Sequence, residues 1–127
     1  MKANSTTDRF NRYFKEEEYC CPCGCCFENL HQELKSILLM IREYYNAPLY
    51  ISSGCRCVEH NEKVGGAKRS KHLTGMAADI NVKGVLIEEL YNLCCKIFGD
   101  EWGGIGIYDT HVHIDVREYP ARWDNRR

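Results

Sequence analysis

The sequence has no apolar run approaching the roughly 20 residues that a membrane-spanning helix needs. Residues 1–9 are polar and lack the apolar core of a secretory signal peptide. A strong charge of either sign is also missing: the formal net charge is -1, which excludes the basic footprint of a nucleic-acid-binding protein. We therefore expect cytoplasmic synthesis, no membrane span and no nucleic-acid partner. A role outside the cell would require release by lysis or an export route that the sequence does not show.

The sequence also lacks internal repeats, low-complexity tracts and linkers that would separate two domains. Its 127 residues suffice for one hydrophobic core, and 44% apolar and 28% charged residues are typical of a globular protein. We expect one domain covering residues 1–127, with the cysteine-rich residues 1–27 packed on it, and a monomer.

Apolar residues at helical spacing predict two amphipathic helices, over residues 28–46 and 85–98. Four short strands are predicted between glycines, a proline and turn-forming residues. They cover residues 49–51, 77–82, 105–108 and 111–117. Asp109 and Thr110 separate the last two strands, which predicts a hairpin. This order of elements indicates an α+β fold, with a small antiparallel sheet and flanking helices.

The last predicted strand concentrates titratable side chains on one face. Side chains alternate across a strand, so His111, His113 and Asp115 share a face while the valines and isoleucine between them point to the core. Three such groups in a row need water or a metal ion to satisfy them. The strand alone leaves both interpretations open, a solvated sheet face or a metal site.

Two further residues favour the metal site. In the strand over residues 77–82, Asp79 points away from the apolar face, and His72 precedes it by seven residues. Each alone is compatible with an ordinary hydrogen-bonding role. Together with the histidine strand they supply two imidazoles and one carboxylate, which suits Zn²⁺ with a fourth position free for water. An open fourth position is typical of a catalytic zinc.

These residues resemble a known family. The pattern Ser70-x-His72-x-x-Gly75-x-Ala77-x-Asp79 before a His-x-His strand is similar to the zinc D-alanyl-D-alanine carboxypeptidases and related phage endolysins. The same fold and zinc site recur in the amino-terminal signalling domain of hedgehog proteins. The resemblance covers roughly residues 10 to 123 and includes Ser53-Gly54-Cys55-Arg56, Asn61, Val64-Gly65-Gly66 and Gly104-Ile105-Gly106-Ile107-Tyr108.

The resemblance implies a zinc metallopeptidase that hydrolyses a peptide bond in peptidoglycan stem peptides, either as a D-Ala-D-Ala carboxypeptidase or as an endolysin-type endopeptidase. A bare catalytic domain of a bacteriophage or prophage lysis protein would explain the missing signal peptide. The alternative is a zinc-containing binding module of the same fold that does not cut its ligand.

Carried over residue by residue, the resemblance makes His72, Asp79 and His113 the zinc ligands. His111 would then face the substrate and stabilise developing charge. Arg56 would polarise the scissile carbonyl or clamp a carboxylate, although a surface salt bridge is the simpler alternative. Ser70 would belong to the substrate-binding loop and orient it by hydrogen bonding.

The general base departs from the family pattern. Many relatives carry a Glu or Asp three residues before the last ligand, where this sequence has Thr110. We predict that Asp109 takes the proton, with Asp115 and His111 as the alternatives. If none of the three reaches the zinc site, the domain would bind without cutting.

The nine cysteines form a separate question. Five of them lie within residues 20–26. Because the total of nine is odd, the cysteines cannot all be paired in internal disulfides. Together with Cys55 and Cys57 they could hold a second, structural zinc, stay as unligated thiols or form disulfides. Cys94 and Cys95 lie on a predicted helix and are expected to be packing residues.

Overall fold

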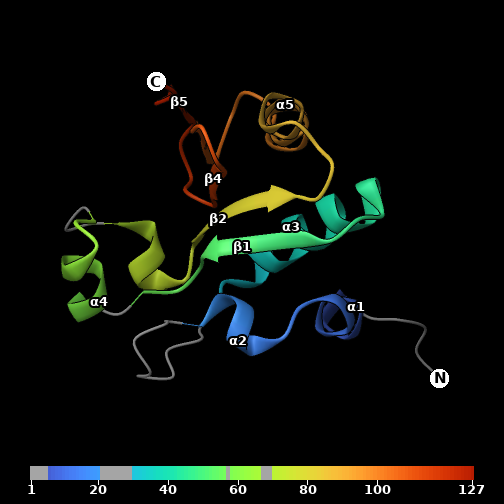
Figure 1. The fold of residues 1–127 in the computed structure, drawn as a ribbon, viewed down its shortest axis with the longest axis horizontal. Coiled ribbons are helices and arrows are strands. Elements are labelled where there is room, and N and C mark those ends of the chain that lie inside the picture. Colours follow the sequence, from blue (N-terminus) through green and yellow to red (C-terminus); the bar gives the residue numbers. More distant parts are fainter. Residues whose placement is uncertain (1–5, 21–29, 57, 67–69) are drawn as a thin grey trace.

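The computed structural model describes residues 6–20, 30–56, 58–66 and 70–127 (Figure 1). Within them lies a five-stranded sheet with the order β1-β2-β4-β3-β5. Its strands are β1 (Leu49–Ser53), β2 (Ala77–Val82), β3 (Gly104–Ile107), β4 (Val112–Asp115) and β5 (Ala121–Asp124). Strands β1 to β4 pair antiparallel, which confirms the predicted sheet and the hairpin of the last two predicted strands.

The sheet differs from the prediction at its carboxyl-terminal edge. Strand β5 was not predicted, and it pairs parallel with β3. Its four residues, Ala-Arg-Trp-Asp, alternate apolar and polar side chains, but the segment is too short for this alternation alone to mark a strand. Strand β4 is also shorter than predicted, which leaves His111 in the turn before it.

Arg122 anchors β5 to the rest of the domain. Its guanidinium donates hydrogen bonds to the carbonyl oxygens of Ala121 at 2.8 Å, Gly99 at 2.6 Å and Trp102 at 3.1 Å, and also to that of Gly103. These bonds and the pairing with β3 fix an edge strand that is too short to be stable alone.

Helices α3 (Gln32–Tyr45) and α5 (Ile87–Phe98) correspond to the two predicted helices. The first begins later than predicted, because His31 ends the preceding segment and its ring accepts a hydrogen bond from the backbone of Glu33 at 3.2 Å. Asn46 ends it in a left-handed conformation with φ 47°. Among the described residues, no helix has the length and apolar character needed to cross a membrane.

Both helices bury apolar side chains against one face of the sheet. Leu34 and Leu38 from α3, Leu90 and Cys94 from α5 and Ile80 from β2 belong to one core and are fully buried. Each buried aliphatic side chain contributes about 1.5–3 kcal/mol. Burial also raises the pKa of the Cys94 thiol to about 12. The opposite face of the sheet is therefore the one that carries polar side chains.

The amino-terminal segment adds two helices that its weak periodicity did not predict, α1 (Thr6–Tyr13) and α2 (Glu16–Tyr19). Phe10, Phe14 and Tyr19 are buried in the core, with the two phenylalanine rings stacked at 4.7 Å. In Figure 1, α1 and α2 lie below α3 and β1. The remaining short helices are α4 (Val58–Lys63) and the 3₁₀ helix η1 (Lys71–Thr74), which precede β2 in the chain.

Candidate metal centre

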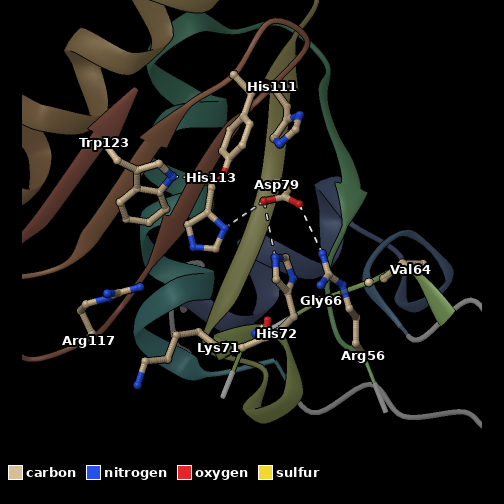
Figure 2. A pocket seen from close by; sticks show the side chains of 13 residues that line it. Arg56, Val64, Gly66, Lys71, His72, Asp79, His111, His113, Arg117 and Trp123 are labelled. Atoms are coloured by element: carbon tan, nitrogen blue, oxygen red, sulfur yellow. Dashed lines mark hydrogen bonds and ion pairs between the residues drawn. The ribbon is translucent and has the colours of Figure 1, made fainter. Parts of the chain in front are cut away.

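Three candidate ligands converge on the polar face of the sheet (Figure 2). Asp79 on β2 and His113 on β4 lie directly opposite each other in the strand register, and His72 comes from η1. Oδ1 of Asp79 lies 3.4 Å from Nε2 of His72 and 3.0 Å from Nδ1 of His113. One ligand atom from each residue lies within 4.8 Å of the others. The structure thus brings together the three side chains that the sequence pattern indicated.

The ring of His72 is oriented by the backbone. Its Nδ1 lies 2.6 Å from the carbonyl oxygen of Gly54, which can only accept, so Nδ1 carries the proton. Nε2 is left with a lone pair that faces Asp79. Ser70 holds the start of η1, because its hydroxyl accepts a hydrogen bond from the backbone of His72 at 3.2 Å. The loop-orienting role of Ser70 stays a prediction, with which this contact agrees.

The ring of His113 is oriented by Asp115. Nε2 of His113 lies 2.8 Å from Oδ2 of this fully buried carboxylate. Asp115 also accepts two hydrogen bonds from the Arg117 guanidinium, both at 2.7 Å, and one from the backbone of Gly104 at 3.1 Å. A proton on Nε2 leaves Nδ1 with the lone pair, directed at Asp79. Such outer partners fix the tautomer and orientation of a metal-binding imidazole.

The donor set fits Zn²⁺. Two imidazole nitrogens and a carboxylate oxygen are borderline ligands of the kind that zinc takes in catalytic sites. In the absence of an ion, burial would raise the pKa of Asp79, but hydrogen bonds from His113 and His72, made when those rings carry a proton on the nitrogen that faces Asp79, outweigh burial and hold the pKa below its ordinary value. The carboxylate is therefore ionised at neutral pH, as a metal ligand must be.

The candidate ligands open into a pocket whose wall is cationic on two sides. Arg56 lies on one side, and Lys71 and Arg117 lie on the other (Figure 2). Three aromatic rings, those of Tyr108, His111 and Trp123, also line the pocket. Positive charge beside the site favours substrates that carry carboxylates.

Arg56 is held in place by the residues that carry the family resemblance. Its guanidinium donates to Ser53 Oγ and to Asn61 Oδ1, each at 3.1 Å, and Nη2 lies 3.7 Å from Asp79 Oδ2. Gly66 leaves the necessary space, because a Cβ there would lie 2.1 Å from Asn61 Oδ1. The Arg56 side chain is only 14% exposed. It is a pocket residue rather than half of a surface salt bridge.

His111 lies in the pocket wall beside the candidate ligands. Its ring stacks on Tyr108 with the centroids 4.5 Å apart and the planes at 12°, and Nδ1 lies 3.1 Å from the Thr110 hydroxyl. Burial lowers its pKa, so the neutral imidazole predominates at neutral pH. A neutral imidazole in this position can accept a proton.

The structure places the other two candidate bases elsewhere. Asp109 is exposed and outside the pocket lining, and its carboxylate accepts from the backbone of Arg127 at 3.3 Å. The carboxylate of Asp115 is already hydrogen-bonded to Arg117 and His113. Asp109 as the base therefore stays a prediction that its position does not favour, and His111 is the titratable alternative that lines the pocket.

Sequence reasoning missed four residues of the pocket wall: Lys71, Tyr108, Arg117 and Trp123. Arg117 could have been found, because it continues the alternation of His111, His113 and Asp115. Trp123 could not, because its place depends on the unpredicted strand β5.

The proposed second metal site falls mostly outside the described residues, since Cys21, Cys23, Cys25, Cys26 and Cys57 are not among them. Within the part of the chain that the structure describes, His72, Asp79 and His113 are the one group of three or more potential ligands close enough to hold an ion. Nothing in that part supports a second zinc.

The α+β fold carries a His-Asp-His site with an open pocket, which is a donor set of the kind found in catalytic zinc sites. The profile of the family described as peptidase M15 matches residues 12–115. The chain therefore belongs to the peptidase M15 family of zinc metallopeptidases, which includes the D-Ala-D-Ala carboxypeptidases that it resembles. A comparison with curated proteins gives no match.

The titration of two of the pocket histidines, His113 and His111, follows from their opposite environments. Burial would lower the pKa of His113, but hydrogen bonds with Asp115 and Asp79 raise it overall. The stability that this group adds is therefore full below about pH 6.5 and lost as the pH rises through its folded-state pKa. The lowered pKa of His111 has the opposite effect on stability. The stability that His111 adds is present above about pH 6.5 and is lost as the pH falls through its folded-state pKa.

We expect the metal-free His111→Gln variant to become less stable as the pH rises from about 5.5 to about 8, because only the His113 contribution remains. Urea denaturation at a series of pH values measures this. The His111→Gln/His113→Gln variant is the control and should show no such decline. A free energy of unfolding that increases over this range would contradict the raised pKa of His113.

Proposed function

We propose that this protein hydrolyses a peptide bond in peptidoglycan stem peptides, as a zinc-dependent carboxypeptidase or endopeptidase. The observation that carries the proposal is the convergence of His72, Asp79 and His113 at the base of a pocket that Arg56 and His111 also line. Membership of the peptidase M15 family supports the peptidase activity. The cationic wall supports the substrate class, since stem peptides carry free carboxylates.

When bound by these three residues, zinc would polarise the scissile carbonyl and lower the pKa of a water molecule toward neutrality. Arg56 is fixed by Ser53 and Asn61, so its guanidinium can stabilise negative charge on the carbonyl oxygen without rearranging. His111 would take a proton from the attacking water and return it to the leaving amine. Ser70 would line the substrate path while it holds η1 in place.

Lys71 and Arg117, on the far side of the candidate ligands from Arg56, would bind a second carboxylate of the substrate (Figure 2). We further propose that the protein reaches the cell wall after lysis, as a bacteriophage or prophage enzyme would, or by a route that the sequence does not reveal.

The test is metal removal combined with digestion of purified muropeptides. The chelated protein should not cleave them, and stoichiometric Zn²⁺ should restore cleavage, because the ligands persist without the ion. Mass spectrometry of the products identifies the bond: loss of one terminal residue indicates a carboxypeptidase, and two larger fragments indicate an endopeptidase.

A binding module remains the second candidate, because Thr110 replaces the family carboxylate and Asp109 lies away from the pocket. Protein that holds zinc and binds muropeptides without cleaving them would establish this candidate and reject the peptidase.

A further inference from the structure

Strand β5 adds a side chain to the pocket from beyond the residues that match the peptidase M15 family. The match ends at residue 115, whereas Trp123 lies on β5 and lines the pocket. The parallel pairing places Trp123 beside Gly106 of β3. A Cβ at Gly106 would lie 2.2 Å from the indole nitrogen, so only glycine admits the indole at this depth.

Trp123 contacts one candidate ligand directly. Its ring centroid lies 5.2 Å from that of His113, with the planes at 45° (Figure 2). Asp115 and Asp79 each contact one ring nitrogen of His113, but these two contacts leave the ring able to tilt about the axis that joins the nitrogens. The indole against the imidazole restricts that tilt and keeps Nδ1 directed at Asp79.

Trp123 also reaches His111 through a second residue. Its indole N–H donates to the hydroxyl oxygen of Tyr108 at 2.9 Å, and the Tyr108 ring stacks on His111. The hydrogen bond fixes the phenol ring, and the phenol ring fixes the imidazole. Trp123 thus contacts His113 directly and His111 through Tyr108. His113 is a candidate metal ligand, and His111 is a candidate general base.

We propose that Trp123 is a positioning residue that sets the relative orientation of His113 and His111. The proposal rests on the proposed peptidase function for its kinetic test. Small errors in the placement of reacting groups are costly in rate, so the role should affect turnover more than substrate affinity.

The kinetic test uses conservative variants that keep an aromatic ring. Trp123→Phe and Tyr108→Phe each remove the hydrogen bond between the two rings, and each should lower kcat about fivefold, the rate equivalent of one hydrogen bond, with little change in KM. Because both remove the same bond, the double variant should be no slower than Trp123→Phe, the variant that also changes the packing on His113. Trp102→Phe is the matched control and should leave kcat unchanged, since Trp102 packs on Phe98 outside the pocket lining.

A second measurement does not depend on hydrolysis. Trp102 and Trp123 are the two tryptophans of the chain, so the Trp102→Phe variant keeps Trp123 as its sole source of tryptophan fluorescence. Adding Zn²⁺ to this metal-free variant should change the indole fluorescence, because its neighbour His113 becomes a ligand. In Trp123→Phe, the emission of Trp102 should not respond, and the zinc affinity should fall by roughly tenfold.

The outcomes separate the two proposals. If wild-type protein cleaves muropeptides but Trp123→Phe matches Trp102→Phe, or if the Trp123→Phe and Tyr108→Phe effects multiply, the positioning role is wrong and the peptidase function stands. If wild-type protein cleaves nothing while Trp123 reports zinc and its replacement weakens zinc binding, the positioning role stands and the peptidase function fails. If the fluorescence of Trp123 does not change when zinc is added, the positioning role is wrong, whether or not cleavage occurs.

Discussion

Replacing His113 by alanine should remove the zinc and slow peptide hydrolysis by at least about 1,000-fold, because a metal lowers the pKa of bound water to about 7. Among the described residues, His113 supplies one of the three donors in the site, and its partner atom in Asp79 lies 3.0 Å away. With the imidazole gone, His72 and Asp79 remain, and two ligands hold zinc poorly in competition with water. Zinc per chain and the rate of muropeptide cleavage are the two quantities to measure.

The matched control is His31→Asn. His31 caps α3 on the backbone of Glu33 and has no part in the pocket, and asparagine is an equally good capping residue. This variant should keep both zinc and activity. Zinc that survives in His113→Ala would contradict the assignment and direct attention to the cysteines around residues 20–26.

The ligand set could be predicted because it depends on short-range rules. Alternation along β2 and β4 puts Asp79 and His113 on the polar face of the sheet, and antiparallel pairing of the two strands makes them neighbours. The register itself was not visible in the sequence, yet the apolar residues between the titratable ones restrict it to pairings that keep one face buried.

The parts that could not be predicted depend on long-range contacts. Strand β5 has only four residues, too few for their alternation to mark a strand, and it is fixed by Arg122 and by pairing with β3, so Trp123 was missed. The two short amino-terminal helices were missed because Phe10, Phe14 and Tyr19 are too few to show a period. The position of Asp109 depends on its contact with the backbone of Arg127, which no local pattern indicates.

Replacing Asp115 should separate stability from metal binding. Its carboxylate is fully buried and pairs with the half-buried guanidinium of Arg117, so Asp115→Ala should lower the free energy of unfolding by about 3–5 kcal/mol by leaving that charge uncompensated. It should also weaken zinc binding by about 10- to 100-fold, because the ring of His113 loses the acceptor for its Nε2 proton. Denaturant titration of the metal-free protein and competitive zinc titration measure the two effects.

The informative comparison is the double variant Asp115→Leu/Arg117→Met, which removes both charges and fills the space with apolar atoms. Replacing a buried ion pair in this way is often neutral, so most of the lost stability should return. Zinc affinity should stay low, because leucine cannot accept the imidazole proton. If affinity recovers together with stability, Asp115 acts on the metal centre only by keeping the strand folded. If stability recovers but zinc affinity does not, the Asp115 carboxylate orients His113 directly. The ion pair with Arg117 then serves to keep the buried Asp115 carboxylate ionised beside His113.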